Sequence, residues 1–324
     1  MSEWRRGWPV VAAGAVGMAV GAALYQYVSS LFIPSLQTAF HWSRGDIASA
    51  AAIGLLAALS APLIGMLADR VGVRIVAGAC LCAVALAHIG FASMTGELWQ
   101  FMACVAVLSA VGPGCSSLAF SRAVNGWFDQ SRGLALGLMA CGISIGTLLA
   151  SPLLAWTIAT HGFRAGYFVL AGLAALIGIP VVLAGISDGP HTGARPDASL
   201  PDTTLSTALR SAPFWLLAVI MFIVNACAAG VLTQLAPLLG DKHMPPGVIT
   251  ALISTFAASV LFGRLAIGWL FDRVEAKHVA AIVTAASAAG ALLLLGSAPS
   301  IPQTALAVFL IGLMQGAETD VLAY

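Results

Sequence analysis

The chain has 324 residues, of which 60% are hydrophobic and only 8% are charged, and its formal net charge is +1. An average soluble domain has about 25% charged residues, so the composition excludes an ordinary soluble fold. The near-neutral charge excludes a nucleic-acid partner, because phosphate binding needs a concentrated basic face. All six cysteines lie within apolar runs, so neither a disulfide framework nor a metal site is expected, and no cofactor is implied.

Apolar runs of about 20 residues predict membrane-spanning helices. The first run, 8–32, follows Arg5 and Arg6, but it is longer than the apolar region of a signal peptide and ends without a cleavage site. We therefore interpret it as a first span. The ten predicted spans are 8–32, 46–67, 75–94, 99–126, 134–159, 165–186, 213–239, 246–271, 279–298 and 302–324.

Two short charged segments interrupt the apolar runs. The segment GMLADRVGVR at 65–74 has a partial echo, GWLFDRVEAK, at 268–277, with Gly, Leu, Asp, Arg and Val in register. A charged turn at the same place in each half of an apolar chain is what an internal repeat produces. The sequence therefore predicts a duplicated all-α transmembrane bundle.

A polar stretch divides the two repeats. We expect residues 1–186 to form a six-helix half, 187–212 to be a linker rich in Pro, Asp, Ser and Thr, and 213–324 to form a second half of about four helices. A repeat that begins as a copy should end as one. The second half is therefore expected to be truncated after about helix ten.

The distribution of Lys and Arg predicts the orientation. With a cytoplasmic N-terminus, nine basic residues lie on the inside and three on the outside, and the two others fall within helices. This asymmetry favours an inner-membrane, multi-pass protein whose N-terminus, linker and C-terminus are cytoplasmic.

The charged turns also carry a family resemblance. The pattern G-x-LADR-x-G-x-R at 65–74 resembles the loop between helices two and three of the major facilitator superfamily, and 268–277 is similar to its counterpart between helices eight and nine. Three further stretches resemble the bacterial monocarboxylate and oxalate–formate transporter branch: FHWSR-x-x-I at 40–47, WF-x-x-x-RG-x-A-x-G at 127–137, and GRL-x-x-G-x-x-x-DR at 263–273. The resemblance implies two halves that rock about a central site.

Arg264 is the main candidate for solute binding. A buried arginine inside an apolar helix costs several kcal/mol unless it faces a cavity, a partner or an anion. Its planar guanidinium can hold a carboxylate through two parallel hydrogen bonds. The alternative is that its head reaches the membrane surface or pairs structurally near Asp272. Where animal monocarboxylate carriers have an acid one turn earlier, this chain has Val260, so the coupled ion, a proton or a counter-anion, stays open.

The charged turns are candidates for a conformational latch. Their charges would pair in one state and separate in another, while the glycines permit close packing and a sharp turn. The alternative is that the basic residues only fix the topology. The candidate latch residues are Gly65, Asp69, Arg70, Gly72, Arg74, Asp272 and Arg273, with Arg122 and Asp129 as possible partners.

Other polar residues within the spans have weaker claims. Gln26, Asn225 and Gln234 lie in helices one and seven, which the resemblance places beside the central path, although interhelical hydrogen bonding explains such residues equally well. Glu318 and Asp320 in helix ten are candidates for ion coupling, or they lie near the surface. His88 is expected to pack.

The segment GISIG around Ser144 matches the G-x-S-x-G pattern of serine hydrolases. That pattern needs a preceding strand and a histidine and an acid nearby, whereas Ser144 falls in a predicted helix, so helix packing is favoured. We therefore expect a secondary transporter of a small organic anion, such as a monocarboxylate, and no enzyme. The alternatives are a truncated, transport-inactive membrane protein of the same family and a membrane hydrolase.

Overall fold

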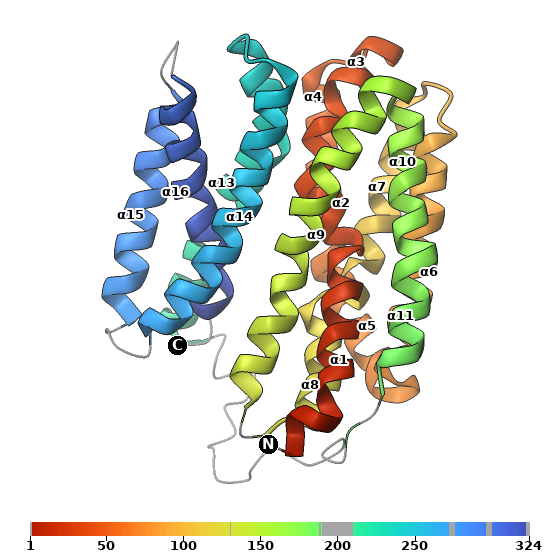
Figure 1. The fold of residues 1–324 in the computed structure, drawn as a ribbon, viewed down its shortest axis with the longest axis vertical. Coiled ribbons are helices and arrows are strands. Elements are labelled where there is room, and N and C mark those ends of the chain that lie inside the picture. The colour runs from red at the N-terminus through yellow and green to blue at the C-terminus, as the bar shows by residue number, and fades with distance from the viewer. Residues whose placement is uncertain are drawn as a thin grey trace.

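The protein is an elongated bundle of helices that run roughly along its long axis (Figure 1). The structure is a computed structural model that describes residues 2–129, 131–187, 189, 210–271, 276–295 and 300–321. Within these ranges the regular structure is entirely helical. The predicted all-α transmembrane bundle is confirmed.

The helices alternate with short turns. Those of the first half are α1 (Ser2–Ala19), α2 (Ala22–Val28), η1 (Ser29–Leu31), α3 (Ile33–Phe40), α4 (Arg44–Ser49), η2 (Ala50–Gly54), α5 (Leu55–Val71), α6 (Val73–Ala92), α7 (Leu98–Val111), η3 (Gly112–Cys115), α8 (Ser117–Trp127), α9 (Arg132–His161), α10 (Phe163–Gly172), the π-helical turn η4 (Leu173–Gly178) and α11 (Ile179–Gly185). Those of the second half are α13 (Ala212–Asp241), α14 (Pro246–Phe271), α15 (Ala276–Leu294) and α16 (Ile301–Val321).

Each of the ten predicted spans coincides with one of these helices or with several consecutive ones. Among the described residues, six helical segments are long and apolar enough to cross a membrane, and a bent pair at the N-terminus makes a seventh. Two shorter apolar helices, Ala281–Leu294 and Ile301–Gly316, lie within α15 and α16. Hydropathy alone therefore located the elements of the bundle.

The first span differs from the single helix that was expected. It begins at Ser2 rather than at residue 8, and it is bent by 46° between α1 and α2. Gly21 stands at the bend, where a Cβ would lie 2.8 Å from the Cβ of Cys115 in η3. The glycine thus allows the backbone to approach η3 closely, and such close approach needs a residue without a side chain.

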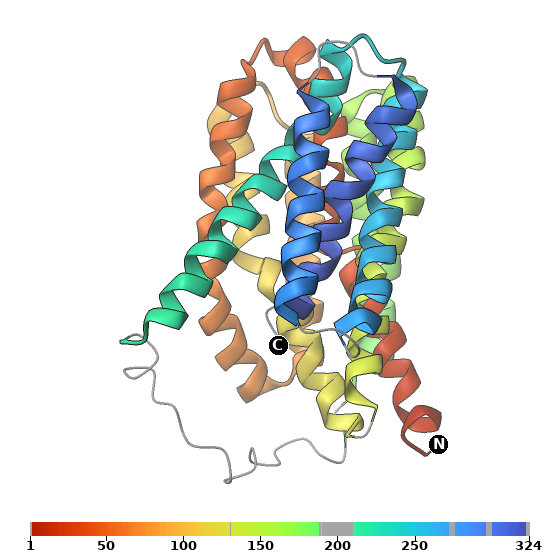
Figure 2. The same cartoon turned by 90° about the vertical axis from the view of Figure 1, so that its left-hand side faces the viewer.

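The helices form two groups that meet along a limited seam. In Figures 1 and 2, α13–α16 stand beside the helices of the first half. The groups pack against each other through α9 with α14, and through α13 with α2, η1 and α3. A site between the halves must therefore involve these elements.

The α1–α9 contact within the first half is unusually close. A Cβ at Gly142 or at Gly146 of α9 would overlap the carbonyl oxygen of Ala15 or Ala19 of α1. Two glycines one turn apart therefore let the helix backbones touch. This contact holds α9 firmly against α1.

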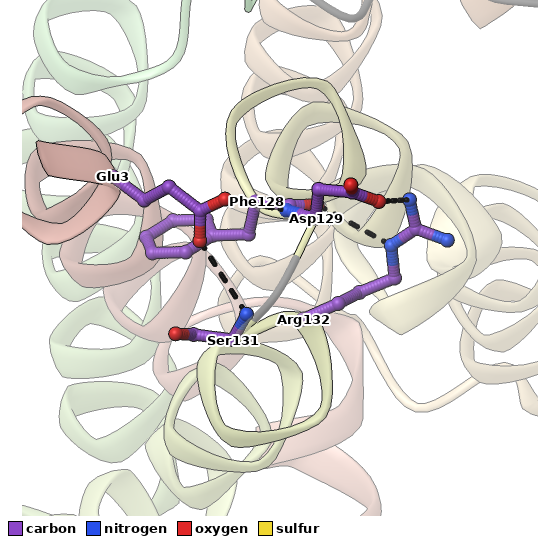
Figure 3. Close-up of polar contacts among 5 residues, drawn as sticks. All are labelled: Glu3, Phe128, Asp129, Ser131 and Arg132. Carbon is purple, nitrogen blue, oxygen red and sulfur yellow. Dashed lines mark hydrogen bonds and ion pairs between the residues drawn. The ribbon is translucent and has the colours of Figure 1, made fainter. Parts of the chain in front are cut away.

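The base of α9 is tied to the start of the chain (Figure 3). The Glu3 carboxylate accepts hydrogen bonds from the backbone N–H groups of Asp129 at 3.2 Å and Ser131 at 3.4 Å. The rings of Trp4 and Phe128 meet edge to face, with their centroids 4.9 Å apart. The α8–α9 turn is therefore fixed to α1, and the position of α9 is set at its base as well as along its length.

Candidate solute site between the two halves

Arg264 lies on α14 and reaches across to the first half. Its residue surface is only 9% exposed, and its Nη1 donates a hydrogen bond to the backbone carbonyl of Ala140 in α9. It precedes Phe271, the last residue of α14, by seven positions, which is about 10 Å along a helix axis. The guanidinium is therefore well inside the bundle, at the seam between the halves.

One N–H group of the Arg264 guanidinium makes no hydrogen bond within the described part of the chain. Its Nε is buried and has no hydrogen-bond partner within the described part of the chain. None of the ion pairs found between described residues includes Arg264. A buried cation without an acidic partner is costly, because removing the charge from water must be offset by nearby acceptors. Such a group is suited to accept an anion.

The predicted glutamines lie on helices that pack together. Gln26 is exposed on α2 and Gln234 is half-buried on α13, and α2 and α13 are in contact. No hydrogen bond joins either glutamine to Arg264 in the part of the chain that the structure describes. The side chains of Asn225, Glu318 and Asp320 lie outside the described residues, so their predicted roles stay predictions.

Asp69 pairs with Arg122, one of the two partners considered for it. Arg122 Nε donates to Asp69 Oδ1 at 2.8 Å, and its Nη1 donates to the Leu118 carbonyl at 2.6 Å. Gly65 lies under this guanidinium, since a Cβ there would be 2.9 Å from Arg122 Nη2. The pair joins α5 to α8 within the first half, rather than one half to the other.

The remaining residues of the charged turn are arranged around Gly72. Gly72 has φ of +92°, a conformation that favours glycine, and it separates α5 from α6. Arg70 and Arg74 are exposed. Asp129 pairs with Arg132 at 3.5 Å and not with Asp69. Residues 272 and 273 of the echo turn lie outside the described residues.

An ion pair that sequence reasoning missed joins the halves at the opposite end of the bundle. Arg44 Nη2 donates to Asp241 Oδ1 at 2.6 Å, and Nη1 donates to Oδ2, so the pair is bidentate. The side chains are 42% and 55% exposed. The hydrogen bond from Arg44 lowers the pKa of Asp241 below its ordinary value of 3.8. Since 197 positions separate the two residues, no local pattern indicates this contact.

A cluster of aromatic rings fills the interior of the first half. The Tyr25 and Tyr167 hydroxyls lie 3.4 Å apart, and the Tyr25 ring meets His88 edge to face at 5.7 Å. His88 Nδ1 donates to the Val84 carbonyl at 2.8 Å. His88 is buried among these rings, which agrees with its predicted packing role.

Ser144 lies in the middle of α9. The strand-to-helix elbow that the G-x-S-x-G pattern requires in hydrolases is therefore not formed there. The neighbouring Gly142 and Gly146 instead face α1, as expected for small-residue helix packing.

The sequence also matches the model of a known family. A family model described as Major Facilitator Superfamily matches residues 11–322. The chain belongs to the major facilitator superfamily.

Individual superfamily relatives are similar at low identity. An uncharacterised MFS-type transporter, YcxA of Bacillus subtilis (strain 168), is 25% identical over 81% of this chain and 64% of its own length. Monocarboxylate transporter 13 of Bos taurus is 23% identical over 97% of this chain and 73% of its own length. The chain thus spans about two thirds of the length of these superfamily relatives.

A solved superfamily structure shows the same fold. The crystal structure of the nucleoside transporter NupG (D323A mutant) superposes with a TM-score of 0.73, covering 97% of this chain and 82% of that one at 15% identity.

Proposed function

We propose that the chain is a secondary transporter, or the transport core of one, for a small organic anion of the monocarboxylate class. The observation that carries this proposal is Arg264, a buried arginine at the seam between the halves whose Nε has no partner in the described part of the chain. Its charge complements a carboxylate, and its planar donors match the two carboxylate oxygens.

The location of Arg264 also suits a solute that must be passed between two faces of a membrane. The arginine belongs to the second half, and its hydrogen-bond acceptor, the Ala140 carbonyl, belongs to the first. Rocking of one half against the other changes the distance between these groups. An anion bound at Arg264 therefore experiences different surroundings in the two states, which is the condition for alternating access.

The comparisons support the solute class. The bovine relative that aligns over 97% of this chain is named a monocarboxylate transporter. At 23% identity this name does not transfer by itself. The buried guanidinium is an independent reason to expect an anionic solute.

The test is anion binding by the purified chain. Radiolabelled lactate is the probe, the neutral lactamide is the competitor that lacks the charge, and formate and oxalate extend the range of acids. Wild-type protein should bind lactate but not lactamide. Arg264→Ala should weaken lactate binding by about 100-fold, because truncating one partner of a buried charge pair has effects of this size.

Two further variants control this test. Arg264→Lys should retain part of the affinity, since it keeps the charge but loses the fork of donors. Arg44→Ala removes the other arginine that bridges the halves and should leave affinity nearly unchanged. Wild-type protein that binds none of the three acids, or Arg264→Ala that binds lactate as well as wild type does, would contradict the proposal.

Uptake distinguishes the transporter from its transport-inactive alternative. Proteoliposomes with the purified chain reconstituted in their membrane should take up radiolabelled lactate, and Arg264→Ala should abolish this uptake. Binding without uptake would favour a chain that holds the anion but does not transport it.

A further inference from the structure

All the hydroxyl groups of α9 except that of Ser144 make the same kind of hydrogen bond. Each donates to the backbone carbonyl four residues earlier, at 2.7 to 2.9 Å: Thr147 to Ile143, Ser151 to Thr147, Thr157 to Leu153 and Thr160 to Trp156. Ser144 does not. It is only 1% exposed, and its Oγ has no partner among the described residues.

Arg264 bonds to the acceptor that this pattern would assign to Ser144. The carbonyl four residues before Ser144 is that of Ala140, and this oxygen accepts the hydrogen bond from Arg264 Nη1. A side chain of the second half therefore uses the acceptor to which Ser144 would otherwise donate. Two buried groups with unused hydrogen-bonding capacity, Ser144 Oγ and Arg264 Nε, are left beside the same turn of α9.

Helical geometry places the Ser144 hydroxyl on the side of Arg264. Gly142 faces α1, and Ala140 and Ser144 each lie two positions from it, about 200° around the helix, so both point away from α1. They are four positions apart and share a face. Side chains in a helix tilt toward its N-terminus, so the Ser144 hydroxyl leans toward the turn of Ala140.

We propose that the Ser144 hydroxyl is the second donor of the anion site and binds the same carboxylate as Arg264. This inference rests on the proposed function. A carboxylate offers two oxygens with several lone pairs, so it accepts hydrogen bonds from Arg264 Nε–H and Ser144 Oγ–H together. One anion would then satisfy both buried groups.

This role assigns the site to both halves of the protein. Ser144 is supplied by α9 and Arg264 by α14, and these helices belong to different halves. The carboxylate would be held most firmly when the two helices are close. Separation of the halves would remove one of the two donors and lower the affinity, which favours release.

Binding of radiolabelled lactate by purified protein tests the role of Ser144. Ser144→Ala should weaken binding about tenfold, since it removes a hydrogen bond to a charged group. Ser151→Ala is the matched control. It deletes a buried serine hydroxyl from the same helix that already has a backbone partner, and it should change affinity less than twofold.

A thermal-unfolding measurement excludes a merely structural explanation. Ser144→Ala removes a buried hydroxyl that has no partner among the described residues, so the protein without ligand should unfold at the same temperature or higher. A lower unfolding temperature with unchanged affinity would show that the hydroxyl has only a packing role, and it would overturn the inference.

A double variant tests whether the two residues act on one anion. Once Arg264→Ala has removed the main contact, adding Ser144→Ala should cause little further loss, because the effects of coupled residues do not add. If Ser144→Ala and Ser151→Ala bind lactate with equal affinity while Arg264→Ala still binds it weakly, the inference about Ser144 is refuted and the Arg264 site is not. Full binding by Arg264→Ala would refute the anion site itself.

Discussion

Among the described residues, Arg44 and Arg264 join the halves of this protein, and they do so in opposite ways. Arg44 lies at one end of the bundle, has a side chain that is 42% exposed, and holds the Asp241 carboxylate through two hydrogen bonds. Arg264 lies inside, and the residue as a whole is 9% exposed. Among the described residues it donates to one backbone carbonyl, and its Nε has no partner there.

The difference indicates which arginine has a function other than joining the halves. An exposed ion pair is largely screened by water and contributes little to stability. A buried guanidinium without an acid is a net cost to folding, and sequences retain such groups mainly where they act on a solute or an ion. Arg44, which is paired with Asp241, is thus the structural arginine. Arg264, whose Nε has no partner among the described residues, is the candidate site.

The largest effect should come from replacing Arg264 by an apolar residue of similar length. Arg264→Met removes the buried charge, so the protein without ligand should unfold at a temperature several degrees higher, while stabilisation by lactate disappears. Thermal unfolding with and without lactate measures both effects. A variant that is less stable than wild type, yet still stabilised by lactate, would reverse the roles of the two arginines.

An intermediate effect is expected at a third arginine, Arg122, whose ion pair lies within one half. Asp69→Asn breaks the pair between α5 and α8 but leaves the seam between the halves intact. Lactate affinity should stay within about twofold of wild type, and the rate of uptake should fall severalfold. A change in affinity with an unchanged uptake rate would contradict the latch role that the sequence suggests for Asp69.

The smallest effect should come from the exposed pair. Asp241→Asn should shift the unfolding temperature by no more than about 2 °C, and added salt should reduce the shift further. Because Arg44 lowers the pKa of Asp241 below 3.8, the contribution of the pair is fully present above that ordinary value and is lost as the pH falls through the lowered pKa. The difference between wild type and variant should therefore be constant from pH 5 to 8. A difference that grows within this range would show that another titrating group is involved.

Hydropathy predicted the spans because burial in a membrane requires long apolar runs, whichever solute is carried. It did not predict the 46° bend between α1 and α2. Gly21 stands at the bend, and the residue that it approaches, Cys115, lies 94 positions later. The sequence alone cannot show which glycine approaches a distant backbone.

The residues of the candidate site could be predicted where a charged side chain occurs within an apolar helix. Arg264 stood out as an arginine within an apolar helix, and Arg122 was named as a partner for Asp69. Ser144 was misleading in isolation, because its motif is typical of hydrolases, whereas its position beside the Ala140 carbonyl that Arg264 contacts depends on the other half. Arg44 begins α4 and Asp241 ends α13, and charged residues at such exposed helix ends are ordinary and carry no signal.

The backbone contact between α1 and α9 has a practical consequence for following motion. A Cβ at Gly142 would overlap the Ala15 backbone, so sliding α9 along α1 would bring larger side chains into steric overlap with that backbone. Spin labels placed on α1 and α9 should therefore report one fixed separation throughout the transport cycle. The α1–α9 distance would serve as a constant reference with which the distance between labels on α9 and α14 can be compared.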